Sequence, residues 1–285
     1  MTPCSRPESS WPVIPEKLYG IIGHPLGHTM SPLLHNWGFA RLGIKAAYLA
    51  FPTPPEGLKG LIQAVRSLLV SGLSVTIPHK EAVMPLLDSL DSSAEMVGAV
   101  NTLVWEQGRL TGHNTDLAGF LRPLGQLEYV PEEALVLGAG GAAKAVLAGL
   151  KELGVGRIYV ANRDPGRAEV TAGKYQAQAV PWEDRTQVKA RLVVNTTPLG
   201  LAGAAQRQSP LPADYWSKGQ VAYDLVYNPL KTRFLAEAQA AGTEVIDGLS
   251  MFAAQGAAQF ELWTGLELPL AEARELLVRA LAARD

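Results

Sequence analysis

The chain changes from strand-like to helix-like sequence within Ala134-Leu-Val-Leu-Gly-Ala-Gly-Gly-Ala-Ala-Lys-Ala-Val-Leu-Ala-Gly-Leu150. The first four residues of this segment form a continuous apolar run, which is typical of a short strand that is buried on both faces. After the glycines, apolar residues recur at helical spacing among good helix formers. The segment therefore predicts a strand, a tight turn and a helix, which together begin a parallel α/β unit.

The turn has the Gly-x-Gly-x-x-Ala pattern of dinucleotide-binding units. Gly138 permits the tight turn, Gly140 lets the backbone approach a pyrophosphate, and Ala143 lets the helix pack closely on the strand. The helix N-terminus adds amide donors and a partial positive charge. Alone, such a pattern also fits an ordinary turn, but the flanking strand and helix favour a cofactor site. Its expected residues are Gly138, Ala139, Gly140, Gly141 and Ala142.

The next predicted strand, at 157–160, leads to the residues that would contact the adenosine ribose. An NAD site would place Asp or Glu there, whereas this chain has Asn162 and Arg163, followed by Arg167. The two arginines favour the 2′-phosphate of NADP(H). Asp164 lies between them and carries the same sign of charge as that phosphate, so NAD stays open as an alternative.

Composition describes an ordinary globular chain of about two domains, with 285 residues, 47% hydrophobic and 18% charged. A net charge of −2 gives no indication of a nucleic-acid or membrane partner, and no apolar run reaches the ~18 residues of a membrane helix. Cys4 is the single cysteine, so an internal disulfide is excluded. Residues 1–15 lack the apolar core of a secretory signal, so we expect a flexible extension on a cytoplasmic protein. No metal is expected, because no Cys or carboxylate accompanies His24, His28 and His35.

Strands and helices alternate along most of the chain, which favours an α/β fold of two domains with mostly parallel sheets. We expect a substrate domain over residues 16–115 and a Rossmann dinucleotide-binding domain over 116–247. Residues 248–285 carry two helices that have no strand left to cover in the second domain, so we expect them to pack back on the first. The expected strands are 17–23, 46–51, 72–77, 101–105, 109–111, 134–137, 157–160, 191–195, 221–225 and 243–246, and the helices are 32–42, 57–70, 81–87, 117–124, 142–150, 250–263 and 269–282.

Two charged residues, one in the first domain and one at the boundary with the second, are candidates for proton chemistry. Lys80 follows the end of the predicted strand 72–77, at the edge where α/β sheets bind ligands. Asp116 precedes a predicted helix, and it could simply cap that helix, just as Lys80 could simply be solvated. Together they could form a pair in which the carboxylate favours the charged ammonium. Such an ammonium could polarise or protonate a carbonyl as hydride arrives.

These motifs together resemble the shikimate dehydrogenases, and the resemblance spans nearly everything from Lys17 to the C-terminus. So many short motifs in one order are far more specific than any one of them. The segments that carry it are Ile22-Gly-His-Pro-Leu-Gly-His-Thr-Met-Ser-Pro32, Ser74-Val-Thr-Ile-Pro-His-Lys80, Gly98-Ala-Val-Asn-Thr102, Gly112-His-Asn-Thr-Asp116, Gly138-Ala-Gly-Gly-Ala142, Asn195-Thr-Thr-Pro-Leu-Gly200, Tyr223-Asp-Leu-Val-Tyr227 and Asp247-Gly-Leu-Ser-Met-Phe-Ala-Ala-Gln255. The family reduces 3-dehydroshikimate to shikimate with NADPH, a step of aromatic amino-acid biosynthesis.

The resemblance implies a role for each matching residue. Lys80 and Asp116 match the catalytic pair, and Thr29 and Ser31 match the hydroxyls that bind the substrate carboxylate. Three further residues match groups that hydrogen-bond the ring hydroxyls, and a tyrosine matches one that faces the substrate; these are Thr76, Asn101 and Gln255, and Tyr227. On the cofactor side, two positions lie beside the nicotinamide and three in the adenosine-phosphate clamp; these are Leu225 and Gly248, and Asn162, Arg163 and Arg167.

The chain departs from the family pattern at three of these motifs. Thr29 is commonly Ser, Asp164 stands where Thr is common, and Leu117 replaces the Gly that often follows the Asn-Thr-Asp triplet. A paralogue that also oxidises quinate, or prefers NAD, therefore stays open as an alternative. A dinucleotide-sensing protein without catalysis is a further one, although the presence of both Lys80 and Asp116 speaks against it. We expect small-molecule partners only, and a monomer or homodimer.

Overall fold

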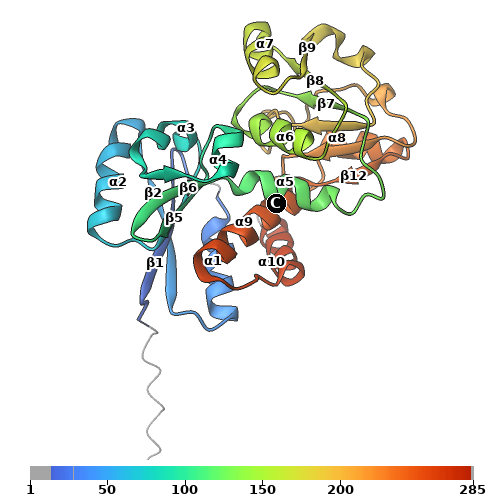
Figure 1. The fold of residues 1–285 in the computed structure, drawn as a ribbon. Helices are drawn as coiled ribbons and strands as arrows, with labels where there is room; N and C mark the ends of the chain where they lie inside the picture. The colour runs from blue at the N-terminus through green and yellow to red at the C-terminus, as the bar shows by residue number, and fades with distance from the viewer. Residues whose placement is uncertain (1–13, 28, 284–285) are drawn as a thin grey trace, which may run out of the picture.

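The computed structural model describes residues 14–27 and 29–283 and contains two α/β units, each built around its own sheet (Figure 1). The first sheet has the strand order β2-β1-β3-β5-β6-β4. Parallel pairing joins β1 to β2, β1 to β3 and β4 to β6, while β5 pairs antiparallel with β3 and β6. The strands are β1 (Lys17–Gly23), β2 (Ala46–Pro52), β3 (Gly72–Val75), β4 (Ser89–Leu90), β5 (Thr102–Glu106) and β6 (Arg109–His113). The strands expected at 101–105 and 109–111 are thus confirmed, as the antiparallel neighbours β5 and β6.

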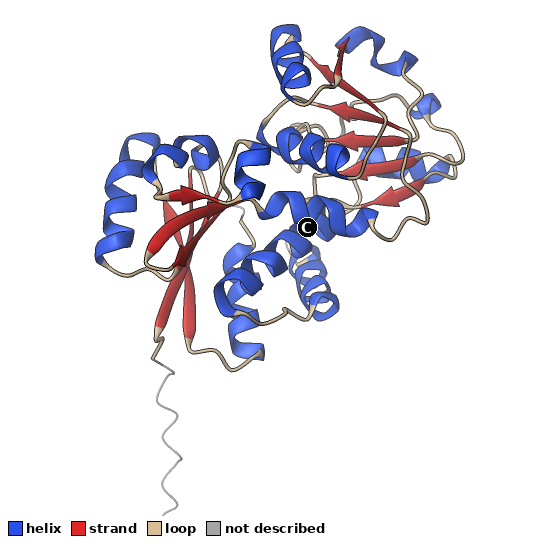
Figure 2. Cartoon of the chain, viewed as in Figure 1, coloured by secondary structure: helices blue, strands red, loops and turns tan. Residues whose placement is uncertain are grey.

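The second sheet is fully parallel, as Figure 2 shows, in the order β12-β11-β10-β7-β8-β9. Its strands are β7 (Glu133–Leu137), β8 (Arg157–Asn162), β9 (Gln178–Pro181), β10 (Leu192–Asn195), β11 (Val221–Asp224) and β12 (Glu244–Ile246). The spatial order of these strands is that of the doubly wound dinucleotide-binding sheet. The strand order reverses between β7 and β10, so β7 lies at the topological switch point. The expected Rossmann fold is therefore confirmed.

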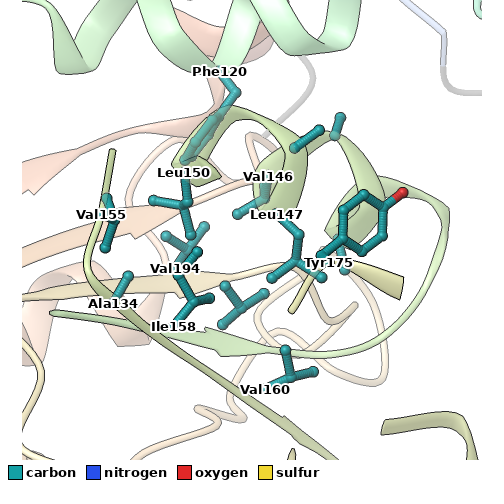
Figure 3. Packing of buried hydrophobic residues seen from close by; sticks show 14 of the residues in the cluster. Phe120, Ala134, Val146, Leu147, Leu150, Val155, Ile158, Val160, Tyr175 and Val194 are labelled. Atoms are coloured by element: carbon teal, nitrogen blue, oxygen red, sulfur yellow. The ribbon is translucent and has the colours of Figure 1, made fainter. Parts of the chain in front are cut away.

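Strand β7 is buried on both faces, as its apolar run predicted. Ala134 and Val136 belong to one hydrophobic cluster, whereas Leu135 and Leu137 belong to another on the opposite face. Figure 3 shows the first cluster, in which Val146, Leu147 and Leu150 of α6 (Gly141–Glu152) and Phe120 of α5 (Thr115–Leu124) meet the strands. Burying each such leucine contributes roughly 1.5–3 kcal/mol.

The two C-terminal helices pack on the first unit, as expected, and the first of them also packs against α5. Helices α9 (Gly248–Thr264) and α10 (Leu270–Ala282) lie beside α1 (Ser31–Arg41) in Figure 1. They share one hydrophobic cluster with β1 and α1, through Tyr19, Leu34, Phe39, Phe260, Trp263, Leu277 and Leu281. The other face of this sheet is covered by α2 (Leu58–Ser67) and α4 (Ser92–Val97).

Several elements differ from their expected bounds. The helix expected over 81–87 is a short α3 (His79–Ala82) followed by a 3₁₀ turn (Met84–Leu86), because Pro85 has no amide hydrogen to continue an α-helix. Strand β3 ends at Val75, two residues early. Strands β4 and β9 and helices α4, α7 (Pro165–Lys174) and α8 (Arg233–Ala240) were not among the expected elements. The extension expected over residues 1–15 falls, up to residue 13, outside the described residues, as do Cys4 and His28.

Candidate active site

A cavity of about 440 Å³ is lined by both units of the structure. The first sheet contributes residues at the carboxyl ends of β1 and β3, the edge where ligands bind in α/β proteins. The second unit and α9 close the other side, through Ala142, Leu225 and Gly248 among others. All eight residues that the resemblance assigned to catalysis or substrate binding line this cavity: Thr29, Ser31, Thr76, Lys80, Asn101, Asp116, Tyr227 and Gln255.

The side chains of Lys80 and Asp116 meet at the cavity wall. Lys80 Nζ lies 2.5 Å from Asp116 Oδ2, and the two side chains are 20% and 14% exposed. Lys80 comes from the short helix α3 and Asp116 from the first turn of α5. Asp116 does not cap α5, because Asn114 is the N-cap and accepts the amides of Asp116 and Leu117. The carboxylate is therefore available to the lysine.

Thr29 and Ser31 form a hydroxyl pair at the start of α1. Thr29 Oγ1 lies 3.2 Å from Ser31 Oγ and accepts the Ser31 amide at 3.3 Å. The helix begins at Ser31, one residue before its expected start, and Met30 is the N-cap. No acidic residue lies in the first turn, so the amide end of α1 and two hydroxyls face the cavity together. This combination suits a carboxylate.

Three more of the expected substrate residues line the cavity. Gln255 lies on α9, and its Nε2 donates to the Phe252 carbonyl at 3.0 Å. The Tyr227 ring packs against the Phe252 ring, with centroids 5.0 Å apart. Thr76 follows β3 and precedes the turn to Lys80. Hydroxyl and amide groups thus line a wall that contains apolar side chains as well, which suits a small polyhydroxylated ring.

Asn101 lines the cavity, but its amide is already engaged. Its Nδ2 donates to Asp116 Oδ1 at 2.9 Å and to Thr115 Oγ1 at 3.0 Å. Its Oδ1 accepts from the Thr115 amide and from Thr102 Oγ1, both at 2.7 Å. The side chain is 2% exposed. In this structure Asn101 therefore orients Asp116, a contact that the resemblance did not indicate.

Sequence reasoning missed several lining residues, among them Ser74 and Gln259. Both could have been found by periodicity. Ser74 lies two residues before Thr76 in an extended segment, so the two side chains face the same way. Gln259 lies four residues after Gln255 on one helix, so it lies on the same face. The other missed lining residues are mainly apolar: Ile21, Pro25, Leu26, Val75, Ile77, Met251 and Phe252.

The glycine turn after β7 fits a diphosphate. Gly138 has φ of +109°, and a Cβ there would lie 2.5 Å from Thr196 Oγ1, so only glycine is accommodated. A Cβ at Gly140 or Gly141 would meet nothing within 4 Å, so the backbone of this turn is accessible. Gly140 is the N-cap of the 12-residue helix α6 and provides no capping side chain, and no acidic residue lies in its first turn. The first amides of α6 are thus available to an anion.

The adenosine side of this turn contains the expected Asn162, Arg163, Asp164 and Arg167. Asp164 Oδ1 accepts the Arg167 amide at 3.1 Å, so Asp164 is the N-cap of α7. Asn162 Nδ2 donates to the Asp164 carbonyl, and Arg167 Nε donates to the Ala139 carbonyl in the glycine turn, both at 3.0 Å. The exposed Arg163 is the next residue beyond β8. The carboxylate that kept NAD open has a structural role here, and the arginines fit a 2′-phosphate.

Leu225 and Gly248 meet where the second unit joins α9. A Cβ on Gly248 would lie 2.5 Å from the Leu225 carbonyl oxygen, so the chain can approach this closely only at a glycine. Both residues line the same cavity as the residues that are expected to bind the substrate. Within residues 14–27 and 29–283, no group of three or more His, Cys, Asp and Glu could bind a metal ion. No helix in the described part of the chain has the length and apolar character to cross a membrane.

Comparison with known proteins agrees with this geometry. Residues 21–103 match a family model described as the shikimate dehydrogenase substrate binding domain, and residues 248–278 match one for the shikimate 5′-dehydrogenase C-terminal domain. The shikimate dehydrogenase (NADP(+)) of Oleidesulfovibrio alaskensis is 57% identical over 274 residues, which cover 95% of this chain and 98% of the relative.

Solved structures give the same result. Shikimate 5-dehydrogenase from Thermus thermophilus, in complex with NADP(H) and shikimate, is 42% identical with a TM-score of 0.85, over 93% of this chain and 99% of the other. Quinate dehydrogenase from Corynebacterium glutamicum, in complex with NAD, is 32% identical with a TM-score of 0.86, over 92% and 99%. Given such identity over nearly its whole length, the chain belongs to the shikimate dehydrogenase family.

Proposed function

We propose that the protein catalyses the reversible reduction of 3-dehydroshikimate to shikimate with NADPH, in aromatic amino-acid biosynthesis. The observation that carries this proposal is the Lys80–Asp116 pair, which lies in one cavity with the hydroxyl groups of the first unit and with Leu225 and Gly248. A relative that is 57% identical and named for NADP(+) supports the choice of cofactor. Small molecules are then the only partners required, and the enzyme acts in the cytoplasm as a monomer or homodimer.

Different residues bind the substrate and act on its carbonyl group. Thr29, Ser31 and the amide end of α1 bind the substrate carboxylate. Thr76 and Gln255 hydrogen-bond the ring hydroxyls, and Tyr227 covers the ring. The chemistry that NADPH supplies when bound is hydride transfer to the carbonyl carbon. Lys80 donates a hydrogen bond or proton to the carbonyl oxygen, while Asp116 orients the ammonium.

The cofactor is bound by residues of the second unit. The backbone of Gly138, Ala139, Gly140, Gly141 and Ala142 would hold the diphosphate, and the nearby arginines would bind the 2′-phosphate. We place the boundaries of this unit at residues 116–247, with 16–115 and 248–285 forming the substrate domain. The boundary near Gly248 is supported by the close approach of α9 to the end of β11.

Steady-state kinetics with shikimate and quinate, each with NADP and NAD, test the proposal. We expect the highest kcat/KM for shikimate with NADP. A higher value for quinate with NAD would refute it in favour of a quinate-oxidising relative. Binding of NADPH without turnover of either substrate would refute it in favour of a dinucleotide-sensing protein.

A further inference from the structure

Gln259 of α9 lines the cavity and makes four hydrogen bonds. Its side chain is 2% exposed. Nε2 donates to the Asn101 carbonyl at 3.1 Å and to Thr102 Oγ1 at 2.9 Å, and Oε1 accepts from Ser74 Oγ at 2.9 Å and from His35 Nε2 at 3.3 Å. A buried amide is costly unless it is fully hydrogen-bonded, so the complete set of partners stabilises one orientation of this side chain.

The orientation of the Gln259 amide follows from its backbone partner. The Asn101 carbonyl can only accept, so Nε2 must face it and Oε1 must face Ser74 and His35. Burial lowers the pKa of His35 to about 3, so the ring is neutral and its single N–H lies on Nε2, which donates to Gln259. Ser74 likewise donates to Gln259, and it accepts from the Tyr48 hydroxyl at 2.6 Å.

The hydrogen bonds continue in the same donor-to-acceptor direction towards Asp116 and Lys80. Thr102 Oγ1 accepts from Gln259 and donates to Asn101 Oδ1 at 2.7 Å. The Thr115 backbone amide can only donate, and its bond to Asn101 Oδ1 fixes that side chain too. Asn101 Nδ2 therefore points at Asp116 Oδ1, at 2.9 Å. The other carboxylate oxygen, Oδ2, accepts from Lys80.

Five side chains thus form a chain of hydrogen bonds in which each donates to the next, and the last donates to the carboxylate of Asp116; they are Tyr48, Ser74, Gln259, Thr102 and Asn101. They come from β2, β3, α9 and the start of β5. All five side chains are at most 4% exposed. Hydrogen bonds in one direction polarise one another, and a buried chain holds its members in one geometry.

We propose that Gln259 is a positioning residue for Asp116, and through it for Lys80. The inference rests on the proposed function, because it assigns Gln259 a part in that reaction. Gln259 acts through Thr102 and Asn101, at the centre of the chain where α9 meets the first sheet. Its removal takes the donor away from the Asn101 carbonyl and from Thr102 Oγ1, so Asn101 can shift with its backbone and displace the Asp116 carboxylate relative to the lysine. A displacement of about 1 Å in such a group can lower a rate by up to about 100-fold.

The test uses Gln259→Met, which keeps the volume of the side chain and removes all four hydrogen bonds. We expect kcat for shikimate oxidation with NADP to fall by about tenfold or more, with KM for NADP within about twofold of the wild type. Thr102→Val breaks the same chain one step closer to Asp116 and should lower kcat in the same way. The double variant should lose no more kcat than the more affected single one, because both substitutions act on one chain.

Trp263→Phe is the matched control. Trp263 lies one turn further along α9, is 8% exposed, and donates to the Leu103 carbonyl of the same strand at 3.0 Å. Its loss should lower the melting temperature but leave kcat within about twofold. The inference is overturned if Gln259→Met keeps kcat within twofold, if the control loses kcat equally, or if the two losses multiply in the double variant.

Two further outcomes are also decisive. If Gln259→Met does not fold, Thr102→Val against the same control decides by the same criteria. If the wild type does not oxidise shikimate with NADP, the proposed function fails by itself. The chain of hydrogen bonds is then tested by the melting temperatures of the Gln259 and Thr102 variants. If the double variant loses less than the sum of the two single losses, the chain is supported; if the losses add, it is overturned.

Discussion

Replacing Lys80 with Met should abolish most of the activity while the protein stays folded. Among the described residues that line the cavity, Lys80 is the only lysine or arginine and Asp116 the only carboxylate. Within the described lining of the cavity, no other lysine or arginine can therefore take over the hydrogen bond to the substrate oxygen. Methionine retains most of the apolar stem of the lysine, so packing around the short helix α3 should change little.

The size of the effect follows from the geometry. Positioned general acids contribute about 10²–10⁴-fold, so kcat should fall by that factor, equivalent to about 3–5 kcal/mol of activation free energy. Asp116 loses its 2.5 Å ammonium partner but keeps the hydrogen bond from Asn101. Losing one charge-assisted hydrogen bond costs about 1.5–3 kcal/mol, which lowers the melting temperature of a protein of this size by about 3–6 °C.

The assay is shikimate-dependent formation of NADPH, measured with the Lys144→Met variant beside it. Lys144 is the matched control, because its side chain is 19% exposed and forms an ion pair at 2.7 Å with Glu81, next to Lys80 in sequence. We expect that control to keep kcat within about threefold. If Lys80→Met retains kcat within tenfold, or if both variants lose the same factor, then Lys80 is not the proton donor.

Three further predictions concern the second unit. Arg163→Ala should raise KM for NADP by about tenfold or more and KM for NAD by less than twofold, because only NADP offers the 2′-phosphate; equal changes in steady-state kinetics would show that the phosphate is bound elsewhere. Asp164→Ala should lower the free energy of unfolding by about 1 kcal/mol in urea titrations, whereas Asp164→Asn should not, because Asn can still cap α7; equal losses would contradict the capping role. Burial raises the pKa of Asp224 from 3.8 to about 7, so its protonated form stabilises the fold below pH 4 and this contribution is lost as the pH rises through 7. Asp224→Asn should therefore raise the free energy of unfolding at pH 8, by up to about 4 kcal/mol, with a gain that shrinks toward pH 4; a variant that is less stable than the wild type at pH 8 would contradict this.

Much of the fold could be read from local patterns. The apolar run and glycine turn at residues 134–143 predicted β7, its burial on two faces and the start of α6, because these depend on residues close in sequence. The last two helices have no strand left to cover in the second domain, and from this the sequence correctly predicted that they pack on the first unit. Short elements such as β4 and β9 were missed, since two to four residues are too few to show a period.

The sequence predicted which residues gather at the candidate site, but it did not predict which side chains contact one another there. The eight expected substrate and catalytic residues line one cavity, yet their motifs could not show which partner each side chain has. Asp116 was a possible helix cap, but Asn114 has that role in the structure, whereas Asp164, which the sequence indicated only as a charge beside the 2′-phosphate, caps α7. Capping depends on where the helix actually begins, which sequence predicts only to within a few residues.

The sequence by itself determined the α/β alternation, the dinucleotide turn and the candidates Lys80 and Asp116, because spacing and residue type are local properties. Only the tertiary structure decided that the Gln259 amide, 157 residues from Thr102, hydrogen-bonds into the support of Asp116. That contact exists because α9 returns across the cavity to cover the first sheet, and a polar side chain buried there must find its partners on whichever strands it meets.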